Sequence, residues 1–178
     1  KSTLNLTHFE KQKLDSLKVK TIYLKFFDVD WDEAAGRPVP AAKLQTTGAE
    51  QLKGFSVIPT VFITNECIQK IDSSQIEKLA ENIYSLITEI KLANGFDSIP
   101  EIQIDCDWTA TTRDKYFQLL KNIKPPTTRR VLWANYKLSA TIRLHQIKFV
   151  AKTGIPPVDR GLLMCYNMGN LKDPATRN

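Results

Sequence analysis

The sequence predicts an α/β fold, namely a (β/α)8 barrel of the TIM type that is incomplete in this chain, with about five parallel strands and intervening helices. Segments with strand character alternate with segments of helical periodicity, which favours parallel strands joined by crossovers. The strands are apolar on one parity and mixed on the other, as suits a barrel whose interior becomes polar near one end. No glycine-rich phosphate loop follows any strand, which weighs against the alternative, a doubly wound open sheet.

The first third of the chain contains one helix and two strands. Thr7 and Glu10 form a capping-box pattern that opens a helix over residues 8–17. A β-branched and aromatic run predicts a strand over 21–27, which leads into the acidic stretch Asp28–Asp32. Five Gly and Pro residues within 33–54 predict a long loop, and a strand follows at 57–64.

The remainder continues the alternation. A second capping-box pattern, Ser74 with Glu77, opens a helix that runs to about residue 93 and stops at Asn94–Gly95. A strand over 101–108 precedes a helix over about 112–123, which Pro125 and Pro126 end. Two further strands are predicted at 137–146 and 161–169.

The length favours one domain, residues 1–178, that is part of a larger barrel. A complete eight-stranded barrel takes about 250 residues, and only about five strands are visible here. The chain also opens with a helix, as though a strand preceded it, and begins at Lys1, as in a processed or trimmed chain.

Composition excludes several classes of partner. The net charge is +6, but the 25 Lys and Arg residues are scattered without a basic stripe, so we expect no nucleic acid. No segment approaches the roughly 20 apolar residues of a membrane span. The three cysteines are far apart and form no CxxC, so we expect them to be reduced and, in strands, buried. No ligand spacing indicates a metal, and no motif indicates a cofactor.

Polar side chains recur on one parity of the predicted strands. Asp105 and Asp107 share a face of strand 101–108, and Arg143 and His145 share a face of the next strand. Glu66 and Tyr166 end two further strands on the same parity. Helices must cover the apolar parity, so Asp107, His145, Glu66 and Tyr166 are expected to converge at the carboxyl ends of the strands, with Asp105 and Arg143 one layer deeper.

A purely structural interpretation accounts for the same residues. Asp105 and Arg143 suit a buried ion pair between neighbouring strands, and a single histidine is more often a hydrogen-bonded core residue than a catalyst. The acids of residues 28–32 suit loop caps. Trp31 suits either the packing of a loop or a platform for a sugar ring.

Two strand strings give the chain a resemblance to known barrels. IDCDW followed by a helix, and later LLMCYNMG, resemble the D-x-D-x-E and M-x-Y-D strands of glycoside hydrolase family 18, the chitinase-like barrels. Over most of residues 1–170 the chain more closely resembles an uncharacterised group of bacterial proteins with the strings FFDVDW, QIDCDW and PPVDRGLLMCYNMG. That second resemblance implies export, to the periplasm or the cell surface.

The resemblance to family 18 implies roles that this sequence fills only in part. Asp105 and Asp107 match the two aspartates, the second of which orients the substrate's N-acetyl group in the substrate-assisted mechanism. Thr109 stands where the family has its proton-donating glutamate, and a threonine hydroxyl is no general acid near neutral pH. Tyr166 matches the family tyrosine, whereas Asn167 replaces the aspartate after it.

These observations predict a glycoside-hydrolase-like domain that acts on or binds carbohydrate at the carboxyl ends of its strands. Asp107, Asp105 and Glu66 are the candidate catalytic acids. The candidate sugar-binding residues are His145, Tyr166, Arg143, Asp30 and Trp31. The alternative is a barrel without catalytic activity, for carbohydrate binding or protein interaction, that lacks the acid at Thr109.

Overall fold

A computed structural model describes residues 2–45, 49–124 and 136–165. Its elements follow in this order: β1 (Ser2–Thr3), α1 (His8–Ser16), β2 (Thr21–Asp32), β3 (Arg37–Ala41), β4 (Leu44–Gln45), the 3-10 helix η1 (Ala49–Leu52), β5 (Ser56–Ile63), α2 (Asn65–Lys70), the 3-10 helix η2 (Ser73–Gln75), α3 (Ile76–Asn94), β6 (Glu101–Cys106), α4 (Arg113–Ile123), β7 (Lys137–Arg143), α5 (Leu144–Lys148), α6 (Val150–Thr153) and β8 (Arg160–Met164).

The centre of the fold is a six-stranded sheet in the order β3-β2-β5-β6-β7-β8. The five strands from β2 to β8 pair in parallel, and only β3 is antiparallel to its neighbour β2. Each parallel strand is added beside the previous one in chain order, without the reversal of direction that marks a doubly wound sheet. The prediction of an α/β protein with five parallel strands is confirmed, and this order is consistent with part of a barrel.

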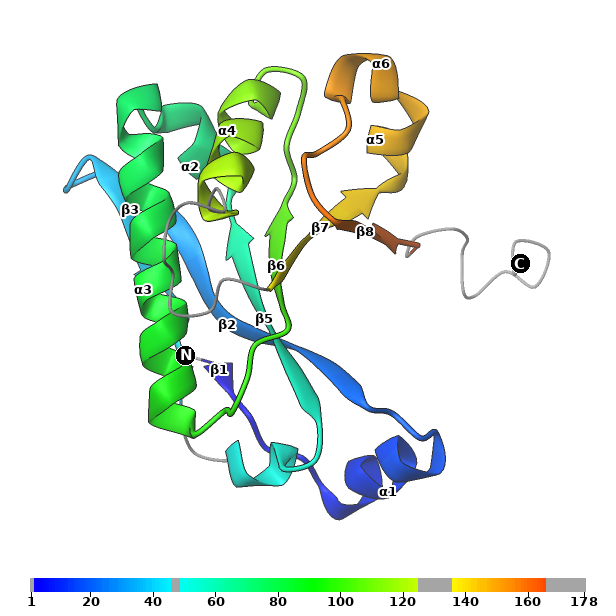
Figure 1. The fold of residues 1–178 in the computed structure, drawn as a ribbon. Coiled ribbons are helices and arrows are strands. Elements are labelled where there is room, and N and C mark those ends of the chain that lie inside the picture. The colour runs from blue at the N-terminus through cyan, green and yellow to red at the C-terminus, as the bar shows by residue number, and fades with distance from the viewer. Residues whose placement is uncertain (1, 46–48, 125–135, 166–178) are drawn as a thin grey trace.

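The helices α2, α3 and α4 bury the apolar parity of the strands. Val61 and Ile63 of β5, and Ile102 and Ile104 of β6, belong to one continuous core with the apolar faces of these helices. In Figure 1, α3 and α4 lie side by side against the sheet. The opposite parity forms what we call the polar face, which carries the charged and hydroxyl side chains of the strands.

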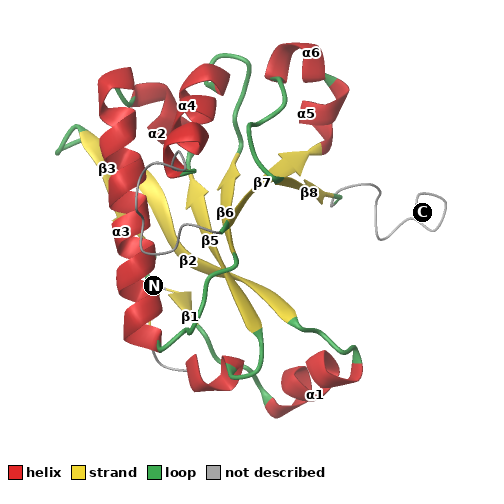
Figure 2. Cartoon of the chain, in the orientation of Figure 1, coloured by secondary structure: helices red, strands yellow, loops and turns green. Residues whose placement is uncertain are grey.

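All parallel strands end at the same edge of the sheet. In Figure 2 the arrowheads of β5, β6 and β7 point toward the end where α2, α4, α5 and α6 lie, and α1 lies at the other end. We call the first of these the carboxyl edge. It is the edge at which the sequence places its candidate site.

Several predicted boundaries are wrong. Strand β2 continues to Asp32 because residues 28–32 pair with β3, a strand inside the segment predicted to be a loop. The Ser74–Glu77 capping box is not formed, since Asp72 instead accepts from the backbone of Ser74 and begins η2. By contrast, the Thr7–Glu10 capping box is formed, and the left-handed Gly95 ends α3 as predicted.

Candidate functional site

The polar face is organised in rows that run across the strands. Lys25, Thr60, Gln103, Ser139 and Arg160 are in register in the lower row. One step nearer the carboxyl edge, Asp28, Phe62 and Asp105 form the middle row. Beyond it, the carboxyl edge carries Asp107 and Arg143 from the ends of β6 and β7. This layered arrangement is the one expected from strand parity.

Asp107 and Arg143 form an ion pair at the carboxyl edge. The pair is partly exposed, with 45% of the Asp107 side chain and 27% of the Arg143 side chain accessible to solvent. The alternative interpretation of Asp105 and Arg143 as a buried ion pair is therefore wrong, and Arg143 lies at the carboxyl edge, not one layer deeper. Asp107 directly follows Cys106, the last residue of β6 and the last to pair with β5, and its carboxylate reaches Arg143 at the end of β7.

Asp105 has a different partner. Its Oδ1 accepts a hydrogen bond from the hydroxyl of Thr141 on β7, and its side chain is half-buried. A carboxylate in such a position keeps further lone pairs for a ligand, because each ionised carboxyl offers about four acceptor sites. Asp105 thus lies on the polar face and Asp107 just beyond the end of β6, in separate local networks.

A buried residue that the sequence did not indicate holds the two strand ends together. Gln146 of α5 accepts from the backbone N–H of Arg143 at 2.8 Å and donates to the carbonyl oxygen of Trp108 at 3.1 Å. Trp108 is itself fully buried, stacks on Tyr116, and donates its indole N–H to the carbonyl oxygen of Thr153. These bonds fix the chain on either side of the Asp107–Arg143 pair.

Glu66 and His145 do not stand at strand ends, which corrects their predicted placement. β5 ends at Ile63 because Thr64 caps α2, so Glu66 lies in the first turn of that helix and pairs with Lys70 at 2.7 Å. β7 ends at Arg143, and His145 is exposed on α5. A helix start directly after each strand displaced both residues from the strand parity on which the prediction depended.

Asp30 and Trp31 lie on opposite sides of β2. Asp30 continues the parity of Asp28 on the polar face, whereas Trp31 packs against the hydrophobic core on the helix-covered side. The prediction that both line one edge of the site is wrong, and of the two interpretations of Trp31 the structure supports packing. Tyr166 lies outside the described residues.

Thr109, at the position of the missing glutamate, takes part in the start of α4. Its backbone N–H donates to the hydroxyl of Thr112 at 2.9 Å, and its own hydroxyl lies 2.9 Å from that of Thr111. Its carbonyl oxygen accepts from the backbone N–H groups of Thr112 and Arg113. The exposed Thr109 therefore orders the turn before α4, and this role needs no ligand.

The described residues hold no group of three or more His, Cys, Asp or Glu side chains that could bind a metal ion. Cys106 is buried in β6 as predicted, and Cys67 is buried as well. The prediction that Cys165 is buried in a strand is wrong, because β8 ends at Met164 and Cys165 is exposed. Among the described helices none is long and apolar enough to cross a membrane.

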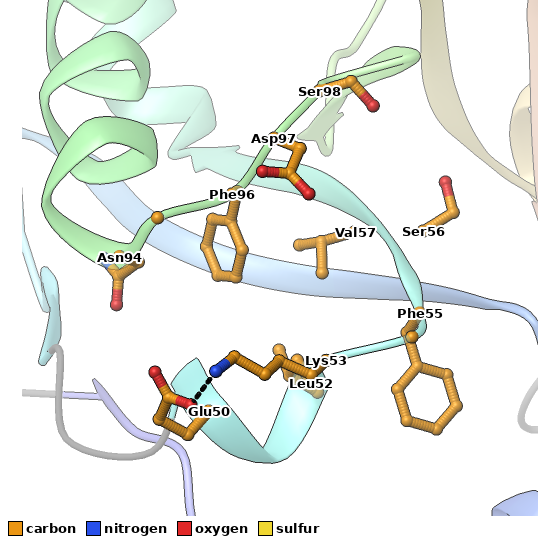
Figure 3. A pocket seen from close by; sticks show the side chains of 12 residues that line it. Glu50, Leu52, Lys53, Phe55, Ser56, Val57, Asn94, Phe96, Asp97 and Ser98 are labelled. Carbon is orange, nitrogen blue, oxygen red and sulfur yellow. Dashed lines mark ion pairs between the residues drawn. The ribbon is translucent and has the colours of Figure 1, made fainter.

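Two cavities lie apart from the Asp107–Arg143 pair. One of about 250 Å³ lies where β5 begins, beside the end of α3, and Phe55, Phe96 and Asp97 are among its lining residues (Figure 3). A second, of about 230 Å³, lies between β3 and α3 beside Arg37 and Lys78. Neither is lined by a candidate site residue from the sequence.

Comparison with known proteins gives a likeness of fold. No protein-family model matches the chain, and no curated protein matches its sequence. The structure is similar to that of a chitinase from Chromobacterium violaceum, with a TM-score of 0.52 and 10% sequence identity. The match covers 95% of this chain and 56% of the chitinase chain, so this chain spans little more than half the length of that neighbour.

Proposed function

We propose that the chain is one domain of glycosidase-like β/α-barrel type that binds an oligosaccharide at the carboxyl edge of its sheet. The observation that carries this proposal is the partly exposed Asp107–Arg143 ion pair at the ends of adjacent parallel strands. Ligands of β/α barrels bind at that edge. The chitinase-like fold favours a carbohydrate among the possible ligands.

The chemistry of the edge suits hydroxyl groups. The Asp107 carboxylate accepts hydrogen bonds, the Arg143 guanidinium donates several in a fixed plane, and a sugar hydroxyl both donates and accepts. Asp30 adds a second carboxylate on the same face. Gln146 and the buried Trp108 hold the strand ends in place, so little ordering would be needed on binding.

The described side chains at the carboxyl edge favour binding of the sugar without its hydrolysis, because they lack the proton donor of the substrate-assisted mechanism. That mechanism needs a proton donor at the place of Thr109, and the Thr109 hydroxyl is no acid near neutral pH. A carboxylate held by a guanidinium, as Asp107 is, serves as an acceptor of hydrogen bonds. The exposed Glu66 pairs with Lys70 on a helix surface.

Isothermal titration calorimetry, which measures the affinity for neutral oligosaccharides, tests the proposal. The panel consists of oligomers of N-acetylglucosamine, glucose, mannose and xylose, with wild type, Asp107→Asn and Arg143→Met. Lys78 and Glu81 form an exposed ion pair on α3, so Lys78→Met and Glu81→Gln are matched controls. We expect at least one oligomer to bind wild type and both controls and to bind each edge variant about tenfold more weakly.

The outcomes separate the alternatives. Absence of binding across the panel, or equal binding by wild type and both edge variants, contradicts the proposal. A parallel assay with aryl glycosides of the same sugars should give no release of the aryl group, and release that Asp107→Asn abolishes would replace the binding proposal with a hydrolase.

A further inference from the structure

The middle row of the polar face places an aromatic ring between two carboxylates. Phe62 of β5 is in register with Asp28 of β2 on one side and with Asp105 of β6 on the other. Neighbouring strands lie about 4.8 Å apart, so the two aspartate backbones flank the phenylalanine at a separation of about 10 Å. That separation is comparable to the width of one pyranose ring with its hydroxyl groups.

Phe62 is not part of the hydrophobic core. Its neighbours Val61 and Ile63 point to the opposite side of β5 and are fully buried among the helices. Phe62 itself is half-buried and is not among the described hydrophobic side chains that pack against the core. An aromatic side chain on a polar sheet face, away from the core, needs another explanation.

Two buried polar atoms, one in the lower row and one in the middle row, lack a partner within the described structure. Gln103 is 3% exposed, and its Oε1 accepts from Thr60, but its Nε2 makes no hydrogen bond. The Oδ2 atom of Asp28 forms an ion pair with Lys25 Nζ at 3.0 Å, whereas its buried Oδ1 has no hydrogen-bond donor. Buried groups of this kind are nearly always paired. The described structure supplies no acceptor for Gln103 Nε2 and no donor for Asp28 Oδ1.

The unpaired atoms define the ligand's chemistry. Gln103 Nε2 requires an acceptor and Asp28 Oδ1 requires a donor, and a hydroxyl group supplies either. An anionic group would meet the carboxylates of Asp28 and Asp105 and be repelled.

We propose that the polar face contains a subsite for one neutral pyranose unit, with a face of the ring on Phe62 and hydroxyl groups bonded to Asp28 and Gln103. This subsite rests on the proposed function, because it extends the oligosaccharide site from the carboxyl edge into the middle row. It selects neutral sugars over uronic acids, because the carboxylates of Asp28 and Asp105 repel a third carboxylate.

Affinity measurements on Phe62→Leu and Asp28→Asn test the subsite. Phe62→Leu keeps an apolar side chain but removes the ring, and Asp28→Asn keeps the shape but removes the charge. Phe55→Leu is the matched control, because Phe55 precedes the same strand and lines the cavity at its other end. Titrations use the neutral oligomer that wild type binds best and oligogalacturonate, after circular dichroism has shown each variant to be folded.

We expect Phe62→Leu and Asp28→Asn each to weaken neutral-oligomer binding about five- to tenfold, with Phe55→Leu unchanged. Equal affinity of wild type and Phe62→Leu, with binding still lost in Arg143→Met, overturns the subsite and leaves the proposed function intact. Tighter binding of oligogalacturonate than of the neutral oligomer also overturns it. A wild type that binds no sugar refutes both proposals.

Discussion

The side-chain amide of Gln146 donates to the carbonyl oxygen of Trp108 at 3.1 Å, joining the segment after β6 to the helix after β7. The same side chain accepts from the backbone N–H of Arg143, and Gln146 is 2% exposed. One buried residue thus satisfies a backbone acceptor and a backbone donor at the two strand ends that carry the Asp107–Arg143 pair. We interpret Gln146 as a positioning residue for this pair.

Replacing Gln146 by leucine should destabilise the fold. Leucine keeps similar bulk but leaves the Trp108 carbonyl and the Arg143 N–H without partners, and each buried unpaired group costs about 1–3 kcal/mol. We therefore expect the free energy of unfolding, measured by urea denaturation, to fall by about 2–4 kcal/mol. Lys148→Gln, exposed on the same helix, should change it by less than about 0.5 kcal/mol. A loss in Gln146→Leu no larger than in the control would show that the bridge is dispensable.

A second prediction concerns Glu101, which is 2% exposed on the polar face. Arg160 donates to its Oε2 at 3.1 Å, and Tyr23 donates to its Oε1 at 3.2 Å. Because removal of Arg160 leaves a buried carboxylate with one partner, Arg160→Met should lower the free energy of unfolding by about 1–3 kcal/mol. Adding Glu101→Gln should recover most of that loss, since no buried charge then remains. A double variant less stable than Arg160→Met alone would refute this account.

The same contact affects the titration of Tyr23. Partial burial, and then the Glu101 charge, raise the pKa of the Tyr23 phenol above its ordinary value of 10.0. The folded chain therefore holds this proton longer than the unfolded chain, so the phenol's stabilising contribution is complete below pH 10 and is lost as the pH rises through the folded pKa. Absorbance titration at 295 nm, with Tyr23→Phe to assign the transition, should show a lower pKa in Glu101→Gln. An unchanged transition would exclude the influence of Glu101.

The cysteines should separate into one reactive and two protected thiols. Burial raises the pKa of Cys67 to about 12 and raises that of Cys106, whereas Cys165 is exposed. At pH 8, a thiol-reactive disulfide should modify one equivalent rapidly in wild type and none in Cys165→Ser, with the other two modified only in denaturant. Rapid modification of all three in the folded chain would contradict the buried positions of Cys67 and Cys106.

The raised thiol pKa also sets a direction for alkaline stability. Because the folded pKa of Cys67 lies above the ordinary value of 9.0, its contribution is complete below pH 9 and declines as the pH rises toward 12. Urea midpoints should therefore fall less between pH 8 and pH 11 in Cys67→Ala than in wild type. An equal fall in both chains would contradict this.

Periodicity predicted the parallel strands well because their helix-facing parity is apolar, as in Val61, Ile63, Ile102 and Ile104. It missed β3, whose residues Arg37–Ala41 include two prolines, because an antiparallel edge strand tolerates proline where its N–H is not needed for pairing. It also missed α2, since a six-residue helix is too short to show a period.

The sequence predicted which face of the sheet carries the candidate site, but not which side chains contact one another there. Strand parity placed Asp105 and Asp107 on the polar face, and the register of β5 with β6 adds Phe62 to them. Parity fails beyond a strand's last residue, which is why Glu66 and His145 were misplaced on helix starts. The role of Gln146 depends on backbone groups of distant segments, for which a single sequence gives no signal.

The central claim, that the carboxyl edge binds carbohydrate, is tested most directly by mapping the site on the isotope-labelled chain. Titration with the best-binding neutral oligosaccharide should shift the amide signals of Asp107, Trp108 and Arg143, and the Arg143 side-chain Nε–H, with the signals of residues 94–98 unmoved. Shifts confined to the cavity that residues 94–98 line at the other end of β5, with the carboxyl edge unmoved, would contradict it.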